Sequence, residues 1–498
     1  MNGKPEEEQG TSGGCLGPLL QSNHPLGPNP TFMEKIANSL YLPPHGALGK
    51  CLTWGLISLL FWFTIYSILG ADGVIGGNIF SLFLIFILCH LGGEIVSTVK
   101  LPPLLGMLIV GICLKSIPAL KPIGDGYDAD WARILKKLAL IVILIRAGLG
   151  LDPVKLRELK FTVLKMALVP VALECTTYGV LGHLLLGMPF LWSFMMGFVL
   201  SAVSPAVVVP AILHISGRGF GLNKGIPTLI MAAASVDNVI NISGFGIMLG
   251  ITFSKGTLVG QIFQGPSDVL IGLAYGIGLG LICLYLPNRK EGGASITRFI
   301  LLLVGGCVAT FGSAKVEHGG AGPLATVVMA FTAGVGWRKQ GMTEANNPVK
   351  AHFGTMWTFF QTFLFGLMGA SINITTLNPD TVKYGIICIA VGTLIRGIFA
   401  FIATYGSGFN LKEQIYVAMG RFPKATIQAA IGSYALDYAR THNGTEEEIA
   451  WGQQILTISI LIILITAPVG SAFLMLSAPK MLHKTVKEEE EPKENGAA

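Results

Sequence analysis

Long apolar stretches separated by short polar ones run through most of the chain, between residues 51 and 476. A helix of about 20 apolar residues crosses the hydrocarbon core of a bilayer, where it satisfies its own backbone hydrogen bonds. The pattern therefore predicts an all-α polytopic membrane protein with about 14 transmembrane helices. The fourteen predicted helices lie at residues 51–70, 78–99, 101–117, 134–151, 161–186, 190–213, 226–253, 269–286, 299–314, 324–337, 351–372, 384–405, 413–436 and 452–476.

Landmark residues recur in the same order in the two halves of the chain, at offsets of 218 to 221 residues. Because seven spans separate equivalent elements, the two six-helix halves are expected to have opposite orientations in the membrane. Such inverted repeats are typical of secondary transporters, and a chance alignment of apolar segments is the alternative. The matched positions are Pro103 and Pro323, Gly148 and Gly369, and Pro205 and Pro423.

The repeats divide the chain into segments. A transporter domain at 49–480 lies between two tails that have no long apolar run, and both tails are expected to be disordered. No apolar core lies near the start, so no cleavable signal peptide is expected. The predicted segments are the tail 1–48, an extra helix 51–70, repeat one 78–253, a linker helix 269–286, repeat two 299–476 and the tail 481–498.

The composition agrees with a membrane protein, because 52% of the residues are hydrophobic, only 12% are charged and the mean hydropathy is +0.64. With the N-terminus inside, the cytoplasmic loops carry thirteen Lys and Arg residues against six outside. This bias favours cytoplasmic termini in a plasma or organelle membrane. The glycosylation sequons at Asn373 and Asn443 then lie outside. The net charge of +6 lies mostly in short loops and indicates no nucleic-acid partner.

Prolines interrupt two of the predicted spans at equivalent places in the two repeats. Pro205 and Pro210 lie in "SAVSPAVVVPAIL", and Pro423 lies in "GRFPKATIQAAIGS". A proline removes a backbone hydrogen bond and breaks a helix, and broken helices in two inverted halves indicate a substrate site near the midplane. A packing kink without function is the alternative reading of each proline.

Asp237 lies midway along the predicted span 226–253 and is the only ionisable residue in it. A carboxylate inside a membrane is costly and usually serves an ion or proton pathway, although a structural anchor is the alternative. Asn238 adds a neutral carbonyl oxygen beside it, and Ser204 and Thr426 lie next to the two breaks. We therefore predict an ion-binding site at Asp237, Asn238, Ser204 and Thr426, with Asp237 as the transient Na⁺ ligand.

Further charges inside the predicted spans need partners or water. Glu174 is expected to pair with Lys424 or Lys350, and Arg396 to brace the broken helices near Asp237. Arg421 lies three residues before Lys424. A gating role and a purely structural ion pair are both open for these residues. No nucleotide loop, metal cluster or nucleophile motif occurs, so we expect neither an enzyme nor a cofactor.

Four segments resemble the sodium/proton antiporters of the NHA type, within the monovalent cation/proton antiporter superfamily. They are "GFVLSAVSPAVVVP", "GIPTLIMAAASVDN", "LIRAGLGLDP" and "PKATIQAAIGS". The resemblance covers about residues 50 to 480. It implies an NhaA-like fold with crossed broken helices, a homodimer, and a six-helix core that slides against a dimerisation domain like an elevator. The extra first helix matches animal members.

The resemblance also implies roles for individual residues. It assigns the intramembrane basic residue to Arg396, the broken-helix lysine to Lys424 and the dimer-side acidic gate to Glu174. Two positions depart from the family pattern. Asn238 stands where a second aspartate, usually the main cation ligand, is expected, and Arg421 stands where animal members have a large apolar residue. Both differences make the site less negative.

Three functions fit these features. The first is an antiporter that exchanges Na⁺ or Li⁺ for H⁺ through Asp237, with the Asp237-Asn238 pair favouring an electroneutral cycle. The second is proton-coupled transport of an anion such as chloride, favoured by the basic residues around one carboxylate. The third is a transport-inactive membrane protein with a regulatory or partner role. Membrane lipids are partners in each case.

Overall fold

The computed structural model describes residues 46–99, 101–151, 160–253, 258–288, 291–316, 318–342 and 347–484, together with 31, 33 and 34. The predicted tails 1–48 and 481–498 thus lie mostly outside the described residues. The chain divides into two compact units, Met1–Phe83 and Leu84–Ala498. Regular structure in the described residues is helical, apart from one isolated bridge between Phe220 and Lys484.

In the described residues, the first unit contains the long apolar helix α2 (Gly46–Leu69), followed by a short 3₁₀ helix, η2 (Gly70–Gly73). Large apolar side chains of α2 such as Trp54 and Phe61 are exposed, as expected for a helix surrounded by lipid. The Trp62 indole N–H donates to the carbonyl of Gly73 at 3.0 Å and ties η2 back onto α2. Helix α3 (Asn78–Thr98) begins in this unit and ends in the second.

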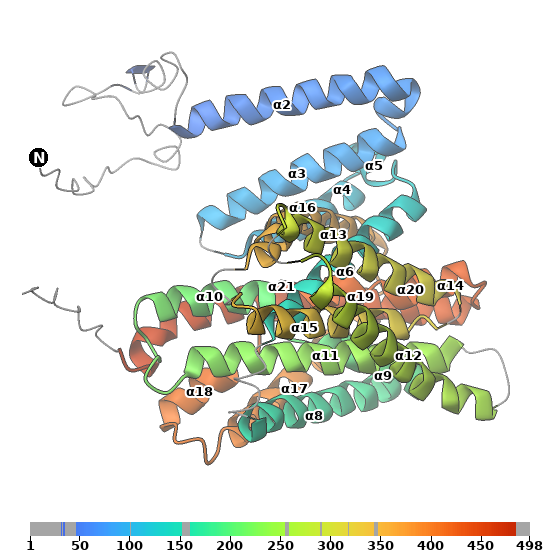
Figure 1. Ribbon diagram of the computed structural model, residues 1–498. Helices are drawn as coiled ribbons and strands as arrows, with labels where there is room; N and C mark the ends of the chain where they lie inside the picture. Colours follow the sequence, from blue (N-terminus) through green and yellow to red (C-terminus); the bar gives the residue numbers. More distant parts are fainter. Residues whose placement is uncertain are drawn as a thin grey trace, which may run out of the picture. The chain divides into compact units, whose positions relative to one another are not determined.

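The second unit holds the remaining helices (Figure 1). They are α4 (Pro103–Ser116), η3 (Pro118–Leu120), α5 (Lys121–Gly124), α6 (Ala129–Gly150), α8 (Lys160–Leu186), α9 (Phe190–Ser201), α10 (Pro205–Gly217), α11 (Ile226–Phe253), α12 (Leu258–Tyr285), α13 (Ala294–Cys307), the π-helix η4 (Val308–Gly312), α14 (Ser313–Lys315), α15 (Ala321–Lys339), α16 (Pro348–Ala370), η5 (Ile374–Thr376), α17 (Pro379–Ala403), α18 (Leu411–Met419), α19 (Thr426–Ile431), α20 (Tyr434–Thr441) and α21 (Glu446–Met481).

Each of the fourteen predicted spans coincides with helical structure. Among the described residues, nine helices are long and apolar enough to cross a membrane, or ten if α4 and the segment Pro118–Gly124, bent by 93°, count as one span. The number of fourteen crossings therefore stays a prediction. The inverted symmetry of the repeats also stays a prediction.

The predicted linker helix has a different start. We expected it at 269–286, but α12 begins at Leu258 and continues through Pro266. The predicted start at residue 269 left Asp268 outside the helix. Asp268 is instead buried, because His318 and the backbone N–H of Gly320 bind its two carboxylate oxygens, at 2.6 and 3.1 Å. A polar residue can lie inside a helix when its partners come from a neighbouring segment.

The helices of the second unit form two packed groups. We call the group that surrounds the broken helices the core bundle, and it comprises α8, α9, α10, α11, α17, α18, α19, α20 and α21. The other, which we call the flanking group, comprises α4, α6, α12, α13, α15 and α16. Contacts of α11 with α12 and α15, and of α19 with α6 and α16, join the two groups.

Small residues allow α4 and α16 to approach closely. A Cβ atom added to Gly111 would lie 2.2 Å from the carbonyl oxygen of Gly366, and one added to Gly369 would lie 2.4 Å from that of Leu108. Such distances are too short for any side chain. Small residues at an interface of this kind let membrane helices pack backbone to backbone.

We predict that Gly111→Val destabilises the protein by about 1–3 kcal/mol, because the new side chain must push α4 away from α16. The matched control is Gly354→Val, since a Cβ atom at Gly354 meets nothing within 4 Å. Thermal unfolding of both variants in detergent checks this expectation. Equal midpoints would show that the close approach does not limit stability.

Candidate ion-binding site at the crossed helix breaks

The first break separates α9 from α10. Residues Ala202 and Ser204 are extended, and Pro205 is the first residue of α10, a position that needs no backbone N–H donor. Pro205 therefore begins a new helix, as predicted. Pro210 was also expected to break the span, which is wrong, because α10 continues through it to Gly217. Neighbouring groups and small backbone adjustments let membrane helices tolerate one such proline.

The second break lies between Met419, the last residue of α18, and Thr426, the first residue of α19. Pro423 lies in the non-helical stretch between them, as predicted. The backbone N–H of Ser204 donates to the carbonyl of Pro423 at 2.8 Å, and the hydroxyls of Ser204 and Thr426 are 3.2 Å apart. The two breaks therefore meet each other.

A side-chain amide also connects the two breaks. Gln428 of α19 donates through Nε2 to the carbonyls of Val199 and Ala202, at 2.9 and 2.8 Å. These carbonyls lie at the end of α9, where the helix leaves acceptors without a partner. Ser204, Thr426 and Gln428 are each fully buried. Thus backbone polar groups at the first break form hydrogen bonds with groups of the second break.

The guanidinium of Arg396, on α17, joins three elements next to this crossing. Its Nη2 donates to Asp237 Oδ2 at 2.8 Å, and its Nη1 donates to Glu174 Oε2 and to the carbonyl of Ser201, the latter at 2.7 Å. All three charged side chains are fully buried. Buried charges of this kind persist only when they are paired and hydrogen-bonded. Arg396 thus braces the breaks near Asp237, as predicted.

Lys424, in the second break, is the other cation of this cluster. Its ammonium donates to Glu174 Oε2 at 3.0 Å and to the carbonyl of Ser201 at 2.6 Å. The predicted pairing of Glu174 with Lys424 is therefore present. Lys350, the other predicted partner, lies in the first turn of α16, outside this cluster. Glu174 lies on α8 in the core bundle, and its role as a gate stays a prediction.

Arg421 makes a weaker approach to the same carboxylate. Its Nη2 lies 3.4 Å from Asp237 Oδ2, yet none of its guanidinium nitrogens forms a hydrogen bond within the part of the chain that the structure describes. Its side chain is nevertheless fully buried. With Arg396 and Lys424, the cluster contains three cationic groups and two carboxylates. The described conformation therefore carries one formal positive charge in excess.

Asn238 is buried beside this cluster, and among the described residues neither its Oδ1 nor its Nδ2 has a hydrogen-bond partner. Buried polar groups without partners are rare and call for an explanation. A second amide on α11 behaves differently. Asn241 donates to the backbone carbonyl of Asp237 at 3.0 Å and accepts a hydrogen bond from Ser201 at 2.5 Å. Asn241 supports the site, whereas Asn238 has an unused ligand oxygen.

Several groups of the site were not predicted from the sequence. The carbonyl of Ser201 accepts from both Arg396 and Lys424, and a backbone carbonyl leaves no mark in a sequence. Tyr178 donates to Glu174 Oε1 at 3.4 Å, and its spacing of four residues from Glu174 is a helical signal that could have found it. In the described residues, no group of three or more His, Cys, Asp or Glu side chains is placed to hold a resident metal ion.

Known proteins resemble this chain in sequence and in fold. A family model described as "Sodium/hydrogen exchanger, transmembrane" matches residues 81–476. Sodium/hydrogen exchanger 9B2 of Homo sapiens is 40% identical over 485 residues, which cover 95% of this chain and 88% of that protein. Sodium/hydrogen exchanger 9B1 of Homo sapiens is 37% identical over 446 residues, which cover 88% of this chain and 85% of that protein.

Among solved structures, the sodium proton antiporter MjNhaP1 from Methanocaldococcus jannaschii at pH 8 has a similar fold. The TM-score is 0.64 at 17% sequence identity, and the match covers 81% of this chain and 98% of that chain. The predicted fold class, an all-helical membrane protein with an antiporter fold, is confirmed.

We predict that Arg396→Ala destabilises the protein by about 3–5 kcal/mol, because the buried carboxylates of Asp237 and Glu174 lose the guanidinium that hydrogen-bonds to both. Thermal unfolding in detergent measures the loss. The control is Arg218→Ala, since Arg218 is exposed. An Arg396→Ala protein that is as stable as the parent, with altered ion selectivity, would contradict this bracing role.

Proposed function

Because the chain belongs to the sodium/hydrogen exchanger family, we propose that it exchanges Na⁺ or Li⁺ for H⁺ across its membrane and that Asp237 carries the cation and the proton in turn. The family is one of transporters and not of enzymes. One observation carries the proposal: a fully buried carboxylate lies midway along α11, against two crossed helix breaks.

The geometry supports a competition between a cation and basic side chains for one oxygen atom of Asp237. Asp237 Oδ2 faces Arg396 at 2.8 Å and Arg421 at 3.4 Å in the described conformation. A cation that binds Asp237 must move these groups or share the carboxylate with them. Arg396 keeps Glu174 as a second partner, so its guanidinium retains one ion pair when the cation arrives. Arg421 has no such second partner among the described residues, and we infer that it is the group that moves.

Asn238 supplies a neutral oxygen to the bound cation in this scheme. The amide that has no partner in the described conformation would gain one when the cation binds. With one carboxylate at the Asp237-Asn238 pair, one proton exchanges for one monovalent cation, and the cycle moves no net charge. We therefore propose an electroneutral exchange with weak cation affinity.

The division into two helix groups supports an alternating-access mechanism. Both breaks, the carboxylate and its basic partners all lie in the core bundle. We propose that the core bundle carries the ion as it slides against the flanking group, in an elevator movement. A homodimer that anchors the flanking group, in contact with bilayer lipids, completes this proposal.

The chain is an integral membrane protein, and we further propose that both termini are cytoplasmic, in a plasma or organelle membrane. The bias of Lys and Arg towards the expected cytoplasmic loops supports this orientation. Accessibility of the sequon residues Asn373 and Asn443 to glycosylation in microsomes would show which face is outside.

Proton-coupled transport of chloride is the second candidate. The excess positive charge of the cluster and the guanidinium of Arg421, which forms no hydrogen bond in the described residues, favour an anion. Flux into proteoliposomes, measured with Na⁺, Li⁺, K⁺ and Cl⁻ in turn, separates the candidates. Na⁺- or Li⁺-driven proton movement supports antiport, and Cl⁻-driven movement would replace it. No movement with any ion would indicate a regulatory protein without transport.

We predict that Asp237→Asn reduces proton-coupled flux to the level of protein-free liposomes, because the exchanged proton loses its carboxylate. Size-exclusion chromatography of the variant verifies that it is folded. The matched control is Asp380→Asn, an exposed aspartate in the first turn of α17. Proton-coupled flux that survives in Asp237→Asn contradicts the assignment.

We also predict that Asn238→Asp lowers the apparent KM for Na⁺ by about tenfold or more. One added charge at about 4 Å is worth on the order of 4 kcal/mol at an effective dielectric near 20, before compensation, and about 1.4 kcal/mol corresponds to tenfold. The new carboxylate also neutralises the excess positive charge of the cluster. Concentration series of Na⁺ in the flux assay measure this change, and an unchanged KM would show that residue 238 takes no part in binding.

A further inference from the structure

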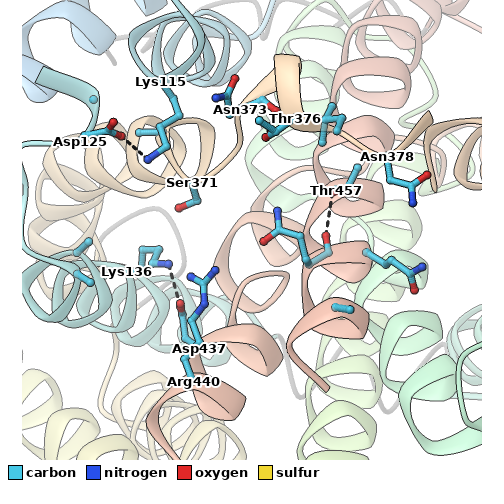
Figure 2. A pocket seen from close by; sticks show the side chains of 18 of the residues that line it. Lys115, Asp125, Lys136, Ser371, Asn373, Thr376, Asn378, Asp437, Arg440 and Thr457 are labelled. Carbon is cyan, nitrogen blue, oxygen red and sulfur yellow. Dashed lines mark hydrogen bonds and ion pairs between the residues drawn. The ribbon is translucent and has the colours of Figure 1, made fainter. Parts of the chain in front are cut away.

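A second polar site lies at one end of the helices, the end at which the two sequons are found. There a cavity of about 600 Å³ opens between the flanking group and the core bundle (Figure 2). We call it the vestibule. Residues from the ends of α4, α6 and α16 line one side, and residues of α17, α20 and α21 line the other. Asn373 of one sequon and Arg440, close to the other, both belong to its wall.

A lysine bridges the two helix groups in the vestibule. The ammonium of Lys136, on α6, donates to Asp437 Oδ2 at 2.8 Å (Figure 2). It also donates to Ser433 Oγ at 2.9 Å. The hydroxyl of Ser433 also donates to Asp437 Oδ2, at 3.1 Å. Lys136 is only 6% exposed, although it is a charged residue. The carboxylate and hydroxyl of one short segment thus hold a cation that the flanking group supplies.

The groups around this ammonium are those that suit a small hard cation. Carboxylate, hydroxyl and amide oxygens are the typical ligands of such ions. Gln454 also lines the vestibule, and its Oε1 has no hydrogen-bond partner among the described residues. The other basic side chain that is paired in the vestibule, Lys115, is bound to Asp125 and not to Ser433 or Asp437.

The position of this pair connects it to the transport site. Ser433 and Asp437 lie just after α19, whose start crosses the first helix break. Tyr434, between them, packs edge-on against Phe245 of α11, the helix that carries Asp237. A displacement that separates α6 from α20 would break the contact between Lys136 and Asp437.

We propose that Ser433 and Asp437 form a cation-binding subsite at the mouth of the transport path, and that Lys136 occupies it as a tethered competitor until α6 and α20 separate. This inference rests on the proposed cation exchange. The subsite takes the same monovalent cation that Asp237 carries. Lys136 then sets how readily that cation enters from the vestibule face, and it is a positioning residue for the exchange.

The test uses the full chain in right-side-out and inverted membrane vesicles. Lys136→Met keeps the apolar stem and removes the charge, so it should lower the apparent KM for Na⁺ at the vestibule face by about fivefold and leave the KM at the opposite face unchanged. Asp437→Asn should raise the KM at the vestibule face. In the double variant Lys136→Met/Asp437→Asn, the KM at the vestibule face should equal that of Asp437→Asn alone. Lys115→Met is the matched control and should leave both KM values unchanged.

A second measurement needs no transport. In detergent, relative to equal choline, Na⁺ should stabilise Lys136→Met against thermal unfolding more than it stabilises the parent. This additional shift should vanish in Lys136→Met/Asp437→Asn, and it should persist in Lys136→Met/Asp237→Asn when that protein is compared with Asp237→Asn. If Lys136→Met leaves the KM at the vestibule face at the parent value and shows no additional Na⁺-dependent shift, the subsite is overturned. A Na⁺-dependent shift in a protein that exchanges no cation supports the subsite and contradicts the proposed function, so the two failures are distinguishable.

Discussion

The guanidinium of Arg396 is the interaction on which the candidate site depends. It binds Glu174 of α8, Asp237 of α11 and the carbonyl of Ser201 at the end of α9, so it joins three helices at one buried point. A charge in this position is stable only while its partners are present, and the partners need it equally. The mutual requirement keeps the first helix break next to the carboxylate, and Lys424 adds the second break to the same arrangement.

The charge balance of this cluster distinguishes the chain from an ordinary cation site. Three cationic groups face two carboxylates, and the position next to Asp237 is an amide. In the proposed exchange, a Na⁺ ion would compete with Arg421 at the carboxylate oxygen. The amide of Asn238 and the guanidinium of Arg421 both lack hydrogen bonds in the described residues, and we propose that the surroundings of these two groups change during the cycle.

Local patterns predicted much of this fold, and long-range contacts account for what they missed. The apolar runs located the helices, Pro205 and Pro423 located the breaks, and the pairing of Glu174 with Lys424 followed from their charge. The start of α12 was missed because Asp268 is satisfied by a segment about 50 residues away. The contact between Lys136 and Asp437 joins residues that are 301 positions apart in the sequence, and no local pattern predicts it.

The central claim is that Asp237 alone exchanges one proton for one cation at the pair, without net charge movement. The most direct test measures, in proteoliposomes, the pH gradient at which a fixed Na⁺ gradient produces no net flux, with the membrane voltage clamped by K⁺ and valinomycin. A one-for-one cycle predicts a null gradient that does not change with voltage. A null gradient that shifts with the clamped voltage would show that charge moves in each cycle, and would contradict this account.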